Sequence, residues 1–240
     1  MRIWGDPVEF KEIKIYPIRM KDYTAFYENV SCLMYEKNKI QDVRVIKMSY
    51  LDFLFALMRE DEDIFKKLEW VLKLVFLNQI FEFRYSEDGL IFLYVNDVVF
   101  NGFEFEKIQK YILDENMIKT ETEIFDTELE KALQEAADFE ASKQGKSATL
   151  EERVVALHCL SGIHYERLKD YTIFQFNQTL TRHSIIKNFD IYSALMAENG
   201  ASKDVVHWLA HIEEKGKYAD VIISQEEFEK ITSDNGLTNK

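Results

Sequence analysis

Hydrophobic positions recur at helical spacing along most of this chain, and the longest such pattern runs from residue 171 to residue 200. Its first half is lined on one side at intervals of three and four residues, by Ile173, Phe176, Leu180 and His183. Thr172 precedes this series, where a side-chain hydroxyl can accept a hydrogen bond from the first turn of a helix. We therefore predict a helix that begins after Thr172 and buries Phe176.

A polar interruption divides the same stretch. Lys187-Asn188 separates the first series from a second one, which consists of Phe189, Tyr192 and Met196. Asn199-Gly200 then provides the residue types that often end a helix in a left-handed conformation. The pattern predicts two helices joined by a break at Lys187-Asn188, and we expect the rest of the chain to be organised around them.

The first 79 residues predict an extended segment followed by helices. Residues Val8–Ile18 alternate in polarity, which favours extended backbone. A helix is predicted over Met20–Lys37, and a second one begins after Ser49, which can cap its first turn. A third is predicted over Ile64–Gln79, with acidic residues at its positively charged N-terminal end. The last two would form an antiparallel hairpin. The stripe of the last helix comprises Leu68, Val71, Leu72, Val75 and Phe76.

A change of period marks a small sheet at about residues 80–100. Polar and apolar residues alternate from Phe81 to Tyr85, and Asp88-Gly89 is a strong hairpin signal. Leu90–Val95 and Val98–Phe100 complete a predicted antiparallel β-meander. A helix is expected to follow over Phe105–Leu113, with Phe105, Ile108 and Ile112 facing inward.

The composition changes again between Asp114 and Glu140, where ten acidic residues face two lysines. We interpret residues 114–148 as an acidic connector between an N-terminal helical unit, 1–113, and a C-terminal helical unit, 149–240. The C-terminal unit is predicted to contain helices after Thr149, over His164–Lys169 and over Asp204–Glu213. The expected fold class is α+β, predominantly α-helical with a small antiparallel β-meander.

Charge excludes some kinds of partner. The 240 residues carry a formal net charge of −13. No basic stripe accumulates, which argues against binding to nucleic acid or to an anionic membrane. The two cysteines, Cys32 and Cys159, both lie in amphipathic stretches and are expected to be buried free thiols. No uninterrupted apolar run is long enough for a membrane span.

Candidate chemistry is weak. His207 and His211 have the spacing that brings two imidazoles to one face of a helix, but no third metal ligand is evident beyond Glu214. His158 and Cys159 are neighbours, so on a helix their side chains would diverge and could not form a nucleophile–base pair unaided. Glycine-rich phosphate loops are absent from the sequence. We expect no enzyme activity, no metal, no cofactor and no small-molecule substrate.

Five stretches of the sequence carry a resemblance to a known group of proteins when they are taken together. They are IYPIRMKDYTAFY, IKMSYLDFLFAL, VNDVVFNGFEFEKIQKYILDEN, YTIFQFNQTLTRHSIIKNFDIYSALMAENG and VVHWLAHIEEKGKYADVIIS. The sequence resembles tail-assembly-chaperone-like or tail-morphogenesis proteins, which are encoded among the tail genes of tailed phages that infect Gram-positive bacteria. It implies a role in tail building, in the bacterial host cytoplasm during assembly or in the virion, and it brings no catalytic residues. A permanent virion component, such as a connector, tail or baseplate part, is the alternative.

Function is then expected to rest on protein–protein contact, with phage tail proteins or through self-association. An exposed aromatic side chain near the C-terminal end, Trp208, is the predicted source of affinity. Glu130 and Glu135, in the acidic segment, are predicted to raise the association rate with a partner of opposite charge.

Overall fold

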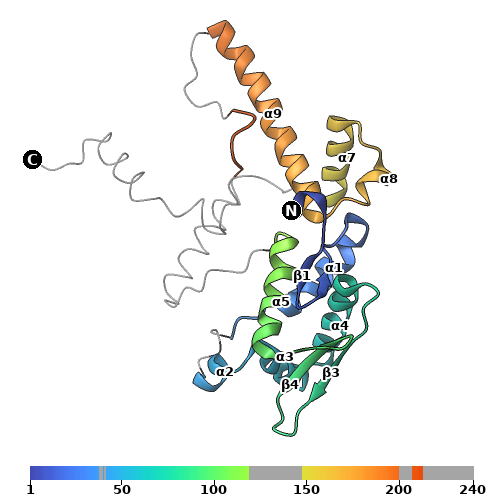
Figure 1. Ribbon diagram of the computed structural model, residues 1–240. Helices are drawn as coiled ribbons and strands as arrows, with labels where there is room; N and C mark the ends of the chain where they lie inside the picture. Colours follow the sequence, from blue (N-terminus) through green and yellow to red (C-terminus); the bar gives the residue numbers. More distant parts are fainter. Residues whose placement is uncertain (38–39, 41, 119–147, 200–206, 213–240) are drawn as a thin grey trace, which may run out of the picture. The chain divides into compact units, whose positions relative to one another are not determined.

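A computed structural model describes residues 1–37, 40, 42–118, 148–199 and 207–212 (Figure 1). The fold is α+β and predominantly helical, with two small antiparallel sheets, so the predicted fold class is confirmed. Residues Met1–Thr120 and Leu150–Ala210 belong to one compact unit. The predicted division into 1–113, 114–148 and 149–240 stays a prediction, because most of the connector lies outside the described residues.

The predicted meander is confirmed. Its strands are β3 (Phe81–Tyr85), β4 (Ile91–Val95) and β5 (Val98–Phe100), in the order β3-β4-β5. Phe83 pairs with Leu93, and Leu93 pairs with Phe100. Gly89 has a φ of 78°, which allows the tight turn between β3 and β4. The alternation read from the sequence therefore gives the correct faces.

Three helices pack with this sheet to form the main core. They are α3 (Tyr50–Met58), α4 (Glu62–Phe76) and α5 (Gly102–Glu115). Each of them begins with a side-chain cap, from Ser49, Asp61 and Asn101 respectively. The predicted stripe of α4 is fully buried, as are the inward residues predicted for α5: Leu68, Val71, Leu72, Val75, Phe76, Phe105, Ile108 and Ile112.

The extended backbone predicted for the N-terminal segment is found in two short strands, but the turn between them was not predicted. Residues 8–15 fold back on themselves as a hairpin of β1 (Val8–Phe10) and β2 (Ile13–Ile15). Lys11 and Glu12 form the turn with φ values of 50° and 68°. Residues other than Gly, Asn or Asp rarely adopt this conformation, so the turn carries no sequence signal.

The helix predicted over Met20–Lys37 is shorter and divided. It consists of the 3-10 turn η2 (Met20–Asp22), α1 (Tyr23–Asn29) and the 3-10 turn η3 (Val30–Leu33). Phe26 and Val30 are buried, whereas Tyr27 and Met34 are exposed. A 3-10 turn has three residues per turn, so the spacing of buried positions changes at Val30. The remaining short helix of this part is α2 (Val43–Lys47).

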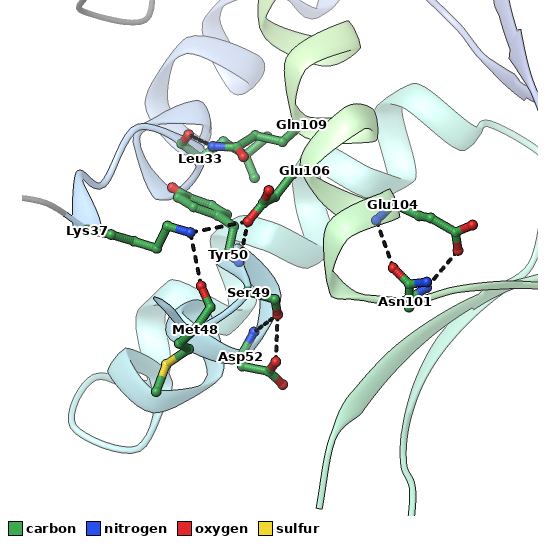
Figure 2. A network of polar contacts seen from close by, with 10 residues as sticks. All are labelled: Leu33, Lys37, Met48, Ser49, Tyr50, Asp52, Asn101, Glu104, Glu106 and Gln109. Carbon is green, nitrogen blue, oxygen red and sulfur yellow. Dashed lines mark hydrogen bonds and ion pairs between the residues drawn. The ribbon is translucent and has the colours of Figure 1, made fainter. Parts of the chain in front are cut away.

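A polar network joins α5 to the start of α3 (Figure 2). The Glu106 carboxylate accepts hydrogen bonds from the Tyr50 backbone N–H at 2.9 Å and from Lys37 Nζ at 3.2 Å. Gln109 Nε2 donates to the Leu33 carbonyl at 2.7 Å. Because Glu106 takes up one of the free N–H groups at the start of α3, α5 and α3 are held in register by hydrogen bonds as well as by apolar packing.

The C-terminal part of the unit contains α7 (Leu150–Ser161), α8 (Tyr165–Leu168) and α9 (Ile173–Asn199). The predicted break at Lys187-Asn188 is wrong, because α9 is one continuous helix. Both residues are exposed, and polar residues on an exposed helix face do not interrupt it.

The start of α9 agrees with the sequence prediction. Thr172 Oγ1 accepts a hydrogen bond from the Gln175 backbone N–H at 3.1 Å, and Gln175 Oε1 accepts one from the Thr172 N–H at 2.8 Å. This is a reciprocal capping box. The Ile173 N–H donates to the Ile18 carbonyl at 3.0 Å, which ties the helix start to the N-terminal segment. Phe176 is 1% exposed, so its predicted burial is confirmed.

Candidate interaction site

Trp208 lies on a turn that is held against α9. The predicted helix over Asp204–Glu213 is wrong for its described part, because residues 207–212 form a turn and non-helical backbone. The Ala210 N–H donates to the His207 carbonyl at 2.8 Å and closes that turn. The Trp208 side chain is 41% exposed and that of Leu209 is 66% exposed. Two large apolar side chains therefore stand together at the surface.

Contacts with α9 fix the position of this turn. Arg182 Nη1 donates to the backbone carbonyls of Trp208 and of Ala210, the second at 3.0 Å. The ring of Phe189 meets the ring of His207 edge-on, with 5.4 Å between their centroids. His207 in turn stacks on Trp208 at 5.5 Å. The indole is thus supported on one side and open to a partner on the other, which is the geometry of a side chain that can anchor a protein contact.

The structure does not describe the other two predicted partner-binding residues. Glu130 and Glu135 lie outside the described residues. Their role in association stays a prediction.

His207 and His211 do not have the arrangement that their spacing on a helix would give. His207 and His211 flank a turn instead of sharing a helix face, and both are exposed. His158 binds the Ile163 carbonyl through Nδ1 at 2.9 Å and stacks on Tyr165 at 4.2 Å between ring centroids. Within the described part of the chain, no group of three or more His, Cys, Asp or Glu side chains could hold a metal ion.

The two cysteines differ, contrary to the expectation that both are buried. Cys32 is buried, and burial raises the pKa of its thiol to about 12. Cys159 is exposed. It lies on α7 two residues after Leu157, which is the buried side chain of that helix. A displacement of two residues on a helix turns a side chain by about 200°, so Cys159 points away from the core.

An aromatic cluster that the sequence analysis missed lies between α3, α4 and the edge of the sheet. The Phe55 ring meets the rings of Phe83 and Tyr85 edge-on, with 5.1 and 6.1 Å between ring centroids. The Phe65 ring meets the Phe83 ring with 6.2 Å between centroids. The cluster borders an open pocket of about 330 Å³, rimmed by Arg59, Glu62 and Lys66. One signal was available: Phe65 lies three residues before Leu68 and seven before Leu72, so it continues the apolar stripe of α4 toward the start of the helix.

A known protein family matches part of the chain. The family model for the YomV second domain matches residues 142–213, which is under a third of the chain. YomV is a protein of a Bacillus prophage, so the match supports a phage-derived origin. No curated protein and no solved structure matches the chain. Among the described residues, no helix is long and apolar enough to cross a membrane. The matched range includes α7, α8, α9 and the Trp208 turn.

Proposed function

We propose that the protein is a non-enzymatic phage tail morphogenesis factor that acts as an assembly chaperone by contact with a tail protein. The observation that carries the proposal is the pair of exposed apolar side chains, Trp208 and Leu209, which Arg182 and Phe189 hold on α9 inside the range matched by the phage family. A supported, exposed indole is a typical anchor of protein–protein contacts. The resemblance to tail-morphogenesis proteins is the reason for placing this contact in tail assembly.

The acidic segment complements this anchor in the proposal. Ten acids between residues 114 and 140 attract a basic partner over a distance of about 10 Å at 0.1 M salt. Such charges mainly raise the association rate, whereas a desolvated aromatic anchor slows dissociation. Reversal of Glu130 and Glu135 to Lys should therefore slow association at low salt and have little effect at high salt.

The test is capture of tail proteins from cells in which the phage is assembling, with the tagged protein and its Trp208→Ala variant. Trp70 offers a matched control, because it is 52% exposed on α4, outside the matched range. Capture that is lost with Trp208→Ala and kept with Trp70→Ala supports the proposal. Equal capture by all three proteins would place the contact elsewhere.

Mass spectrometry of purified virions separates the two roles in tail building. A chaperone is absent from mature particles, whereas a connector, tail or baseplate part is present in a fixed ratio to other tail proteins. Detection of the chain in stoichiometric amounts would replace the chaperone proposal with the structural one.

A further inference from the structure

Strand β3 has one free side. It is the first strand in the order β3-β4-β5, and it lies at the outer edge of the sheet in Figure 1. Two hydrogen bonds flank its pairing with β4: the Ser86 N–H donates to Leu90 O at 2.9 Å, and the Asn96 N–H donates to Ile80 O at 2.7 Å. Even-numbered residues of β3 therefore turn their backbone groups toward β4.

The backbone N–H and C=O groups of the odd-numbered residues of β3 therefore point away from β4. In an antiparallel pair, successive residues direct their N–H and C=O groups to opposite sides. The outward groups belong to Phe81, Phe83 and Tyr85. No other described residue outside the β3–β4 ladder forms a hydrogen bond with them. An open edge of this kind is a template for a further strand.

The side chains of β3 are complementary to a second copy of the same strand. Glu82 and Arg84 lie on the exposed face, with side chains 51% and 59% exposed, and they pair with each other within the chain. If two β3 strands run antiparallel and are centred on Phe83, each Glu82 stands directly opposite Arg84 of the second copy. This is also the only outward-bonding register that pairs all five residues of the strand.

The other face of β3 supports the same register. Phe83 would stand opposite Phe83, and Phe81 opposite Tyr85, beside the open pocket that Phe55 and Phe65 border. Aromatic pairs across antiparallel strands stabilise the sheet, as do opposite charges. Both faces and the backbone groups therefore favour one occupant.

We propose that the protein forms a two-fold symmetric dimer in which β3 pairs with β3 of a second copy. The two meanders join into one continuous sheet. The single β3–β3 pair contributes two symmetric contacts, each between Glu82 of one copy and Arg84 of the other. This self-association does not require a phage partner and goes beyond the proposed function.

Charge exchange tests the register. Glu82→Arg or Arg84→Glu alone places like charges opposite each other twice, and each should raise the dimer dissociation constant by about tenfold or more at low salt. Mixing the two single variants restores both attractive pairs in a heterodimer, and the double variant Glu82→Arg/Arg84→Glu restores them in a homodimer. Analytical ultracentrifugation measures each case. Glu166 and Lys169 form an exposed ion pair at the C-terminal end of α8, so Glu166→Arg and Lys169→Glu are matched controls and should leave the dissociation constant unchanged.

Hydrogen exchange tests the strand pairing itself. Amide exchange in residues 81–85 should slow as the protein concentration rises, and should lose that dependence in either single variant. A wild-type chain that stays monomeric at its highest soluble concentration would overturn the proposal. A dimer that tolerates both single reversals, or single variants that do not associate when mixed, would overturn it as well.

Discussion

Residues 1–118 and residues 148–199 contain similar helical patterns but bury them to very different extents. In the first part, α3, α4, α5 and the meander enclose one large core. In the second, the separate cluster of fully buried side chains consists of Leu157, Leu168 and Phe176. No described side chain of α9 beyond Leu180 is fully buried. An apolar period therefore predicts a helix in both parts, and it predicts burial only where another element covers the face.

The largest effect is expected in the main core. Phe105→Ala removes a fully buried ring from α5 and should lower the free energy of unfolding by about 3–5 kcal/mol, since the cavity cannot close. Urea denaturation followed by circular dichroism measures the change. Phe103→Ala, on the exposed side of the same helix, is the control and should change it by under about 0.5 kcal/mol. Equal losses would show that the Phe105 ring is no more buried than the Phe103 ring.

The small cluster should respond less strongly. Phe176→Ala should cost about 3 kcal/mol, at the lower end of the range for a buried ring, because few neighbours surround it and they can move into the space. The loss should appear first as faster hydrogen exchange in α7 and α9. An unchanged melting temperature would show that this cluster does not hold α9.

A third effect on stability is expected where the start of α5 packs closely against the start of α3. A Cβ on Gly102, at the start of α5, would lie 2.0 Å from Ser49 Oγ, the atom that caps α3. Gly102→Ala should therefore lower the free energy of unfolding by about 1–3 kcal/mol, although alanine favours helices.

A double-mutant cycle sharpens this prediction. Ser49→Gly removes the two atoms that would lie within 3 Å of the new methyl group, Ser49 Oγ and Cβ, but it also removes the cap of α3. In that background, Gly102→Ala should be neutral or stabilising, since only the gain in helix propensity of up to about 1 kcal/mol remains. Equal costs in both backgrounds would mean that the methyl group is accommodated without contact.

The sequence predicts the fold well where periodicity and burial coincide. The strands of the meander, the stripe of α4 and the inward face of α5 were all identified, because alternation or a three-and-four spacing is matched there by a covering element. The errors have local causes. Lys11 and Glu12 form a turn in a conformation that their residue types do not signal, and Lys187-Asn188 is an ordinary exposed helix surface.

The candidate site was only partly predictable. Trp208 could be named from its residue type, but the turn that presents it depends on Arg182, which lies 26 residues earlier. The aromatic cluster of Phe55, Phe65 and Phe83 joins three elements that are distant along the chain. Side chains that meet only after folding leave no spacing pattern in a single sequence.

The smallest effect concerns the two cysteines, which distinguish the two parts without any substitution. Cys32 lies in the main core and Cys159 on the exposed side of α7. A thiol reacts as the thiolate, so a thiol reagent at pH 8 should modify Cys159 in the folded protein and leave Cys32 intact until the chain unfolds. Mass spectrometry after proteolysis identifies the modified residue. Rapid modification of Cys32 under native conditions would show that the main core opens as readily as the second part.

The same contrast should be visible in the dependence of stability on pH. In the folded chain the Cys32 thiol keeps its proton up to a pKa of about 12, whereas in the unfolded chain it loses the proton near its ordinary pKa of 9.0. Between these two values the unfolded state binds fewer protons, so the free energy of unfolding should fall as the pH rises. Burial also raises the pKa of Tyr50, which adds to the fall above pH 10. Cys32→Ala should make the slope shallower between pH 9 and pH 12, because it removes the buried thiol whose pKa differs between the folded and the unfolded chain.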